Sequence, residues 1–269
     1  MNWSRVGAIM KKDIKAITAS KMVMIPMFVV PLILCIAMPA VVLIVAFTMD
    51  TVVISGAQFF EKLIPLYPVP ENLNSMTDKI MYIFLNYTFL PLFMLLPIMA
   101  SSIIASNSIV GEKERKTLET LLYTPVTNRE FMVAKLLSAF IPAVLISYGG
   151  FIGFFSVLNL ISYLYRNILI IRSWIWLPAI LLLSPSVSLL GLSITLVVSL
   201  KAKSFADAQQ MAGLIVLPFI ALIIVQITGV ITFNALYVVL FSIVLVIISY
   251  LIIVRVAPRF SRENIISTL

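Results

Sequence analysis

The longest charged segment of the chain covers residues 111–130. It is the first place to look for residues that bind a partner protein. Its sequence reads Gly-Glu-Lys-Glu-Arg-Lys-Thr-Leu-Glu-Thr-Leu-Leu-Tyr-Thr-Pro-Val-Thr-Asn-Arg-Glu. Residues 117–123 can form two helical turns with leucines on one face and an acidic residue on another. Such a short helix can dock into a soluble partner. A polar loop explains the residues equally well, because Pro125 ends that helix and Thr127 with Glu130 matches a capping box for the next one.

The residue types that most enzymes need are missing. The chain has no His, which removes the commonest general base and the commonest metal ligand. Its single Cys, Cys35, lies in an apolar run and permits neither an internal disulfide nor a Cys-rich metal cage. No phosphate-binding motif of the form G-x-x-x-x-G-K-[ST] occurs. We therefore predict no catalytic residue, no metal site and no cofactor in this chain, and we predict that it is not an enzyme.

The composition decides the kind of fold that must position these segments. Hydrophobic residues make up 62% of the chain and charged residues 11%, and the mean hydropathy is +1.13. A typical soluble domain contains roughly 25% charged residues, so this chain cannot hide its apolar surface in water. Long uncharged runs each suffice to cross a bilayer, and the last one, 208–254, is long enough to fold back once. We predict an all-α integral membrane protein with six transmembrane helices, at about 22–49, 80–108, 132–162, 174–200, 209–227 and 235–255.

The basic residues predict how the chain is oriented. Fifteen of the 19 Lys and Arg residues fall in segments that share a side with the amino terminus. Because Lys and Arg are enriched in cytoplasmic loops, both termini are predicted to be cytoplasmic, in a multi-pass protein of the cell membrane. Residues 1–21 show apolar positions at helical spacing and read as an interfacial helix in contact with membrane lipids. The basic face of this helix accounts for the net charge of +8, so we predict no nucleic-acid partner. The six-helix domain covers 22–256, and 257–269 form a cytoplasmic tail.

The predicted spans contain polar residues but no acidic ones. Every acidic residue lies in a predicted loop or flank, which argues against an ion-coupled carrier, since such carriers normally need an ionisable group within the membrane. Uncharged polar side chains could line a path for a substrate, but holding helices together is the more common role for any one of them. The candidates for such a path are Asn86, Ser102, Asn159 and Gln226.

The charged segment resembles the ABC-2 family of ABC-transporter permeases. That family carries a Gly-Glu-Lys-Glu-Arg-Lys-Thr-Leu-Glu-type motif followed by Leu-Leu-x-x-Pro between its second and third spans. The resemblance implies six spans behind an amphipathic elbow helix, in an ABC-2 (type V exporter-like) architecture. It also implies that the first inner loop contacts a separate nucleotide-binding ATPase subunit, which holds ATP and Mg²⁺. The matching residues are Glu112, Glu114, Arg115, Thr117, Leu118, Glu119, Leu121, Leu122 and Pro125.

The resemblance extends to a second inner loop over residues 201–210. It implies a secondary contact with the ATPase subunit through Lys201, Lys203 and Asp207. Ser204 and Asp207 also have the spacing of a helix cap, and capping is the simpler role for Asp207. The short external segment 50–79 departs from sodium-exporter-like relatives, which often carry a large domain there.

Two functions from different classes fit these observations. The first is a permease subunit of an ATP-binding cassette transporter, an exporter that pairs with a second copy of itself or with a similar permease. The alternative is a membrane scaffold or immunity protein that recruits a cytoplasmic partner through the same loop and transports nothing. The identity of the partner separates them, because only the first requires an ATPase.

Overall fold

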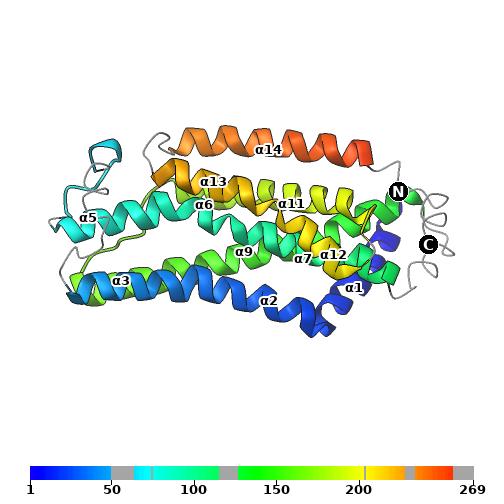
Figure 1. Cartoon of the computed structure of the whole chain (residues 1–269), viewed down its shortest axis with the longest axis horizontal. Coiled ribbons are helices and arrows are strands. Elements are labelled where there is room, and N and C mark those ends of the chain that lie inside the picture. Colours follow the sequence, from blue (N-terminus) through cyan, green and yellow to red (C-terminus); the bar gives the residue numbers. More distant parts are fainter. Residues whose placement is uncertain (50–63, 74, 115–126, 203, 228–233, 257–269) are drawn as a thin grey trace.

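The computed structural model describes residues 1–49, 64–73, 75–114, 127–202, 204–227 and 234–256. Six helical segments run alternately up and down along the long axis of the molecule (Figure 1). Each is long and apolar enough to cross a membrane. Within the described ranges all regular structure is helical. The prediction of an all-α protein with six spans is therefore confirmed.

One helix precedes the bundle, and several crossings consist of more than one helical piece. Helix α1 covers Trp3–Ala19. The first crossing contains α2 (Lys21–Pro31), η1 (Leu32–Ala37) and α3 (Met38–Met49). The short turn η2 (Ile64–Leu66) precedes the second crossing, which contains α5 (Met76–Ile83), η3 (Phe84–Thr88), α6 (Phe89–Phe93) and α7 (Leu95–Glu114).

The remaining crossings follow in chain order. The third is one unbroken helix, α9 (Asn128–Arg166). The fourth contains α10 (Trp176–Pro178), η4 (Ala179–Leu183) and α11 (Ser184–Ser199). The fifth contains α12 (Phe205–Gly213) and α13 (Val216–Ile227), and the sixth is α14 (Ala235–Val256). The predicted spans 80–108 and 132–162 lie inside helices that continue further toward the charged segment, and the predicted tail 257–269 lies outside the described residues.

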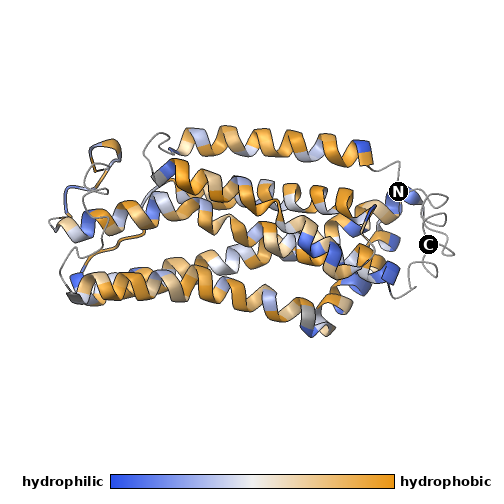
Figure 2. Ribbon diagram, in the orientation of Figure 1, coloured by the Kyte–Doolittle hydropathy of each residue, from blue (hydrophilic) through white to orange (hydrophobic). Residues whose placement is uncertain are grey.

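The second crossing forms the centre of the bundle. In its most apolar stretch 89% of the residues are buried, compared with 61% for the fourth crossing and 17–28% for the other four. Hydrophobic residues make up most of the length of the peripheral helices (Figure 2). Many of their side chains are exposed, for example those of Ile25, Leu145 and Leu236. A protein in water would bury such side chains, so this outward apolar surface is suited to contact with lipid.

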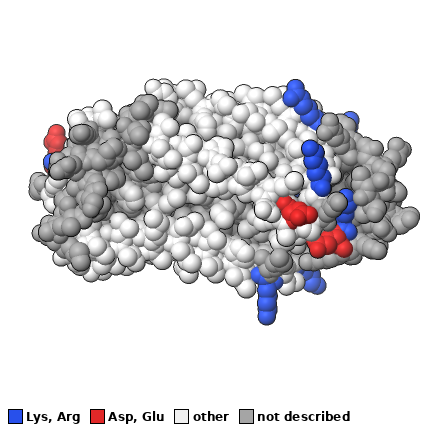
Figure 3. All heavy atoms as spheres, in the orientation of Figure 1, with Lys and Arg blue, Asp and Glu red and all other residues white. Residues whose placement is uncertain are grey.

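Charged side chains gather at the two ends of the bundle. On the face drawn in Figure 3 they cluster at the end where α1 lies, and the middle shows none. We call this end the basic end. Its described Lys and Arg residues are Arg5, Lys11, Lys12, Lys15, Lys21, Lys113, Arg129, Lys135, Lys201 and Arg255, whereas the opposite end has Lys79, Arg166 and Arg172.

Proline residues accompany the irregular turns of the crossings. Pro39 follows Cys35 of the π-helical turn η1 by four residues, and Pro185 follows Leu181 of η4 by four. The third π-helical turn, η3, ends three residues before Pro91. Proline has no amide hydrogen for the carbonyl four residues earlier and its ring crowds that carbonyl, so wider turns near it are expected. These turns explain the divisions within the first, second and fourth crossings.

Gly191 of α11 lies in close contact with α7. A Cβ atom added at Gly191 would lie 2.5 Å from Ser101 Oγ and 3.1 Å from the backbone oxygen of Ile98. The hydroxyl can rotate away, but the backbone of the central helix cannot move without disturbing its other neighbours. Glycine at this position therefore sets the distance between the two most buried crossings.

We expect Gly191→Ala to destabilise the protein by about 1–3 kcal/mol, the usual cost of overpacking a well-filled interior. Gly149→Ala is the matched control, because a Cβ atom at Gly149 meets nothing within 4 Å. The measurement is the apparent unfolding temperature of the purified protein in one detergent. Equal unfolding temperatures for the two variants would contradict the close approach.

Candidate functional site

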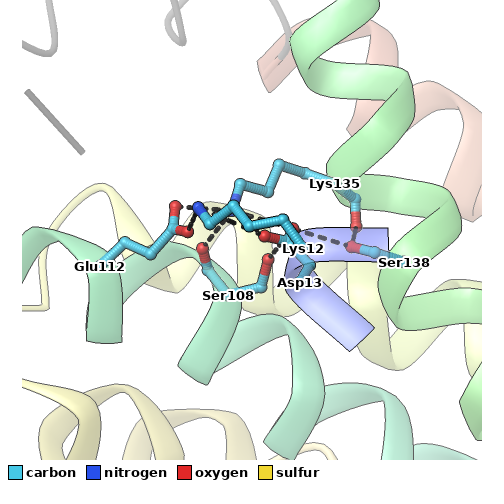
Figure 4. Close-up of polar contacts among 6 residues, drawn as sticks. All are labelled: Lys12, Asp13, Ser108, Glu112, Lys135 and Ser138. Carbon is cyan, nitrogen blue, oxygen red and sulfur yellow. Dashed lines mark hydrogen bonds and ion pairs between the residues drawn. The ribbon is translucent and has the colours of Figure 1, made fainter. Parts of the chain in front are cut away.

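A buried cluster of ionised side chains lies at the basic end, next to the charged segment (Figure 4). Lys135 comes from the first turns of α9, Asp13 from the middle of α1, and Glu112 from the end of α7. The Lys135 Nζ atom lies 2.9 Å from Asp13 Oδ2 and 2.6 Å from Glu112 Oε2. It also donates to the carbonyl oxygen of Ser108 at 2.8 Å. A lysine ammonium has three hydrogens, and here it faces three acceptors.

Three further side chains complete this ion cluster. The hydroxyl of Ser108 donates to Asp13 Oδ2 at 2.9 Å, and the hydroxyl of Ser138 lies 3.2 Å from the same oxygen. Lys12 forms an ion pair with Glu112 from the neighbouring position on α1. Among the described residues the cluster thus contains two formal positive and two formal negative charges, which balance.

Burial makes the cluster a strong constraint on the helices that carry it. The side chains of Lys135 and Asp13 are each 2% exposed, and that of Glu112 is 11% exposed. Removing ions from water costs several kcal/mol each, which only close and fully hydrogen-bonded partners can offset. Because the partners stand on α1, α7 and α9, these three helices cannot separate at this end without exposing unpaired charges.

The positions of Asp13 and Lys135 in the sequence indicate that both side chains need a buried partner. Asp13 stands four residues from Ile9 and four from Ile17, so it lies on the apolar face of α1, and all three side chains are buried. Lys135 lies within the predicted span 132–162. An acid on an apolar helix face and a lysine inside a span both need a partner. The expectation that acidic residues occupy loops or flanks overlooked the burial of Asp13, whose partners come from distant parts of the chain.

The start of α9 is fixed to the start of α1. The Thr127 hydroxyl accepts the amide hydrogen of Glu130, and the Glu130 carboxylate accepts that of Thr127, so the predicted capping box is confirmed. The same carboxylate accepts the amide hydrogen of Asn2 at 2.6 Å. Asn2 in turn caps α1 by accepting the amide hydrogen of Ser4. One carboxylate therefore satisfies backbone donors of two helices.

Glu114 connects the end of α7 to the start of α12. Its Oε2 atom accepts the amide hydrogen of Phe205, the first residue of α12, at 3.0 Å. Ser204 caps the same helix by accepting the amide hydrogen of Asp207 at 3.1 Å, as its spacing predicted. Carboxylates are favourable near a helix amino terminus because the first amide hydrogens lack partners within the helix. The contact ties the last turn of α7 to the helix of the second loop.

Small apolar side chains support this connection. Val110 of α7 packs against Ala202 and Ala208, on either side of the start of α12. A hollow of about 330 Å³ lies beside the contact, and its wall includes Glu114, Asn107 and Phe205. Of the predicted secondary contacts, Lys201 and Asp207 are exposed, as a contact with a partner requires, and Lys203 lies outside the described residues.

The structure separates the predicted coupling residues into two groups. Glu112 is held in the ion cluster and Glu114 caps α12. Both contacts fix the last turn of α7, from which the charged segment continues. Contact of these residues with an ATPase stays a prediction. The others lie outside the described residues: Arg115, Thr117, Leu118, Glu119, Leu121, Leu122 and Pro125.

Two of the proposed path residues hold an extended segment in place near the opposite end. The Asn86 amide donates to the carbonyl oxygen of Ile170 at 2.7 Å and accepts the amide hydrogen of Ser173. Asn159 exchanges two hydrogen bonds with the backbone of Ile171, at 2.9 and 3.2 Å. Buried backbone outside a helix needs such partners. In these contacts Asn86 and Asn159 hold the backbone of residues 170–173 in place. A role of either residue in a substrate path stays a prediction.

Gln226 has a similar structural contact, and Ser102 lies elsewhere. The Gln226 side chain of α13 donates to the carbonyl oxygen of Tyr87 at 2.6 Å. Pro91 follows Tyr87 by four residues and has no amide hydrogen to give it, so Gln226 supplies a donor that the proline lacks. Ser102 is buried in α7, and its hydroxyl has no hydrogen-bond partner among the described residues. Asn86, Asn159 and Gln226 thus bond to backbone in the half of the bundle away from the basic end, whereas Ser102 lies further along α7.

The six crossings and the apolar exterior define a polytopic α-helical membrane protein. The family model of the ABC-2 family transporter proteins matches residues 7–257. The chain belongs to this family and is a membrane permease component of the ABC transporter type. No curated protein and no solved structure matches the chain.

We expect Lys135→Met to destabilise the protein by about 3–5 kcal/mol, because two buried carboxylates lose their shared cation. Asp13→Asn combined with Lys135→Met should cost less than the single lysine change, since it restores charge balance. Lys15→Met is the control, because Lys15 is exposed and makes no ion pair with a described residue. Unfolding temperatures in detergent provide the measurement, and a double variant no more stable than Lys135→Met would argue against the cluster.

Proposed function

We propose that this chain is the permease subunit of an ATP-driven exporter and works with a separate nucleotide-binding ATPase subunit. The observation that carries the proposal is the construction of the basic end. The central helix α7 leads directly into the charged segment, and its last turns are held by the ion cluster and by the cap on α12. A loop anchored in this way can transmit force to the centre of the bundle.

The orientation of the chain follows from charge. The basic end faces the cytoplasm and carries α1, because Lys and Arg residues near membrane spans accumulate on that side. The chain resides in the cell membrane with both termini inside. This places the inner loops on the side where ATP is available.

Coupling follows from the mechanical connections of the first inner loop. ATP and Mg²⁺ belong to the partner subunit, since the chain has no phosphate-binding loop of the Walker type. Closure of the ATPase subunits displaces residues 115–126, whose two ends continue into α7 and α9. The ion cluster holds these helices to α1, so the three move together. Nucleotide binding thereby shifts the population between inward-open and outward-open arrangements.

A second permease chain completes the transporter. Two ATPase subunits present two docking sites, and assemblies of this kind are commonly two-fold symmetric. The second chain is another copy of this protein or a similar permease, and each contributes one set of inner loops.

The first experiment is purification of the tagged protein from its native membranes in a mild detergent, followed by identification of stoichiometric partners by mass. We expect a soluble subunit with a Walker motif. Recovery of this chain alone, also after gentle crosslinking, would contradict the proposal and favour a scaffold without transport activity.

We expect Glu114→Gln to reduce the stimulation of ATP turnover by the assembled complex about 5- to 10-fold, a coupling free energy of about 1–1.4 kcal/mol. The substitution weakens the cap that fixes α12 to α7. Glu71→Gln is the matched control, because Glu71 is an exposed acid at the opposite end. ATP hydrolysis by the reconstituted complex relative to the isolated ATPase is the measurement. Unchanged stimulation in Glu114→Gln would exclude this coupling route.

A further inference from the structure

Helix α1 presents three different surfaces. Its buried face carries Val6, Ile9, Asp13 and Ile17, with Val6 and Ile9 packed against Ala134 of α9. The two other surfaces point away from this packing. They contain no acidic residue, because Asp13 is the only acid of the helix and it is buried. The outer surface of α1 therefore carries only positive charge.

One outer surface is apolar and the adjacent one is basic. At 100° per residue, Trp3, Met10 and Ile14 fall on one stripe, beside the stripe of Lys11 and Lys15. Trp3 is 65% exposed, Met10 and Ile14 are partly exposed, and both lysines are exposed. An apolar stripe with a tryptophan bordered by lysines is suited to the boundary between headgroups and acyl chains.

The two lysines find no counter-ion in the part of the chain that the structure describes. Among the described residues, neither Lys11 nor Lys15 makes an ion pair, whereas the neighbouring Lys12 pairs with Glu112. Lys12 therefore faces the ion cluster, whereas Lys11 and Lys15 face outward. A negatively charged group from outside the described protein is the natural partner for the outward pair.

The position of α1 brings these lysines to the membrane surface. Ser20 alone separates the end of α1 from the start of the first crossing at Lys21. Figure 1 shows α1 at the end of the bundle, directly beyond α2. With a link of one residue, α1 cannot move far from the point at which the first crossing enters the bilayer.

We propose that the outer surface of α1, through Lys11 and Lys15 beside Trp3, Met10 and Ile14, binds anionic phospholipids of the inner leaflet. The lysine ammonium groups contact the lipid phosphates, and the apolar stripe contacts the upper acyl chains. This binding rests on the membrane orientation in the proposed function and is independent of the ATPase subunit. Because Asp13 on the opposite face is held by Lys135, the same helix links the lipid surface to the root of the first inner loop.

The test uses Trp3 as the only tryptophan. The chain contains three tryptophans, so Trp174→Phe and Trp176→Phe leave Trp3 as the reporter. The purified variant is reconstituted into vesicles of phosphatidylcholine with a minor fraction of phosphatidylglycerol, and bromine is placed on either lipid to quench nearby fluorescence. We expect several-fold stronger quenching per brominated lipid when the bromine is on phosphatidylglycerol.

Matched variants distinguish a specific surface from general attraction to charge. Lys11→Gln with Lys15→Gln should abolish the preference for phosphatidylglycerol, whereas replacement of both by Arg should retain it. Lys79→Gln with Arg172→Gln removes the same charge at the opposite end and should leave the preference intact. Thermal unfolding verifies that each variant is folded.

Two results would overturn the proposal. Equal quenching by the two brominated lipids in the parent protein excludes selective binding, and a preference that survives Lys11→Gln with Lys15→Gln excludes these residues. If the lysines bind the ATPase subunit instead, the parent protein will show no lipid preference. In that case Lys11→Gln with Lys15→Gln will reduce recovery of the ATPase subunit. Since the quenching assay contains no ATPase, failure of the transporter assignment leaves its outcome unchanged.

Discussion

The buried ammonium group of Lys135 is the constraint on which the basic end of the structure depends. An ion in an apolar interior must have close partners of opposite charge, and Lys135 finds them on two other helices, at Asp13 and Glu112. The requirement joins α1, α7 and α9, which are far apart in the sequence. It also fixes the last turns of α7, from which the charged segment leaves the bundle. A neutral core would pack equally well, but it would not impose one register on three helices.

A second constraint, the need to satisfy backbone groups in a region without water, shapes the opposite half of the molecule. In the segment after α9, Ile170 and Ile171 lie buried against the helices, and Asn86 and Asn159 bond to their backbone. Gln226 supplies a donor to the Tyr87 carbonyl, for which Pro91 has none. In a bilayer an irregular or broken helix persists only where neighbouring groups provide such partners. Gln226 therefore supports the helix turn before Pro91, and Asn86 and Asn159 hold the segment that follows α9.

These two constraints divide the molecule into a rigid end and a segmented end. At the basic end, charge pairs and caps connect α1, α7, α9 and α12, so motion of one inner loop is shared by several helices. Toward the opposite end, three crossings contain π-helical turns next to prolines, where a helix bends more readily. A transporter that is driven from one end and opens at the other needs this combination. The short link at Ser20 further keeps α1 beside the start of the first crossing.

The sequence by itself determined the class of the protein, the number of spans, the segregation of charge, the capping box at Thr127 and Glu130, and the family resemblance of the charged segment. Each of these depends on composition or on residues a few positions apart, which hydropathy and helical periodicity record. Only the tertiary structure decided that Asp13 pairs with Lys135, that Glu114 caps α12, and that Gln226 serves Tyr87. Their partners stand about a hundred residues away along the chain. A local pattern can show that a buried charge or a broken helix needs a partner, but the partner is chosen by how the helices pack.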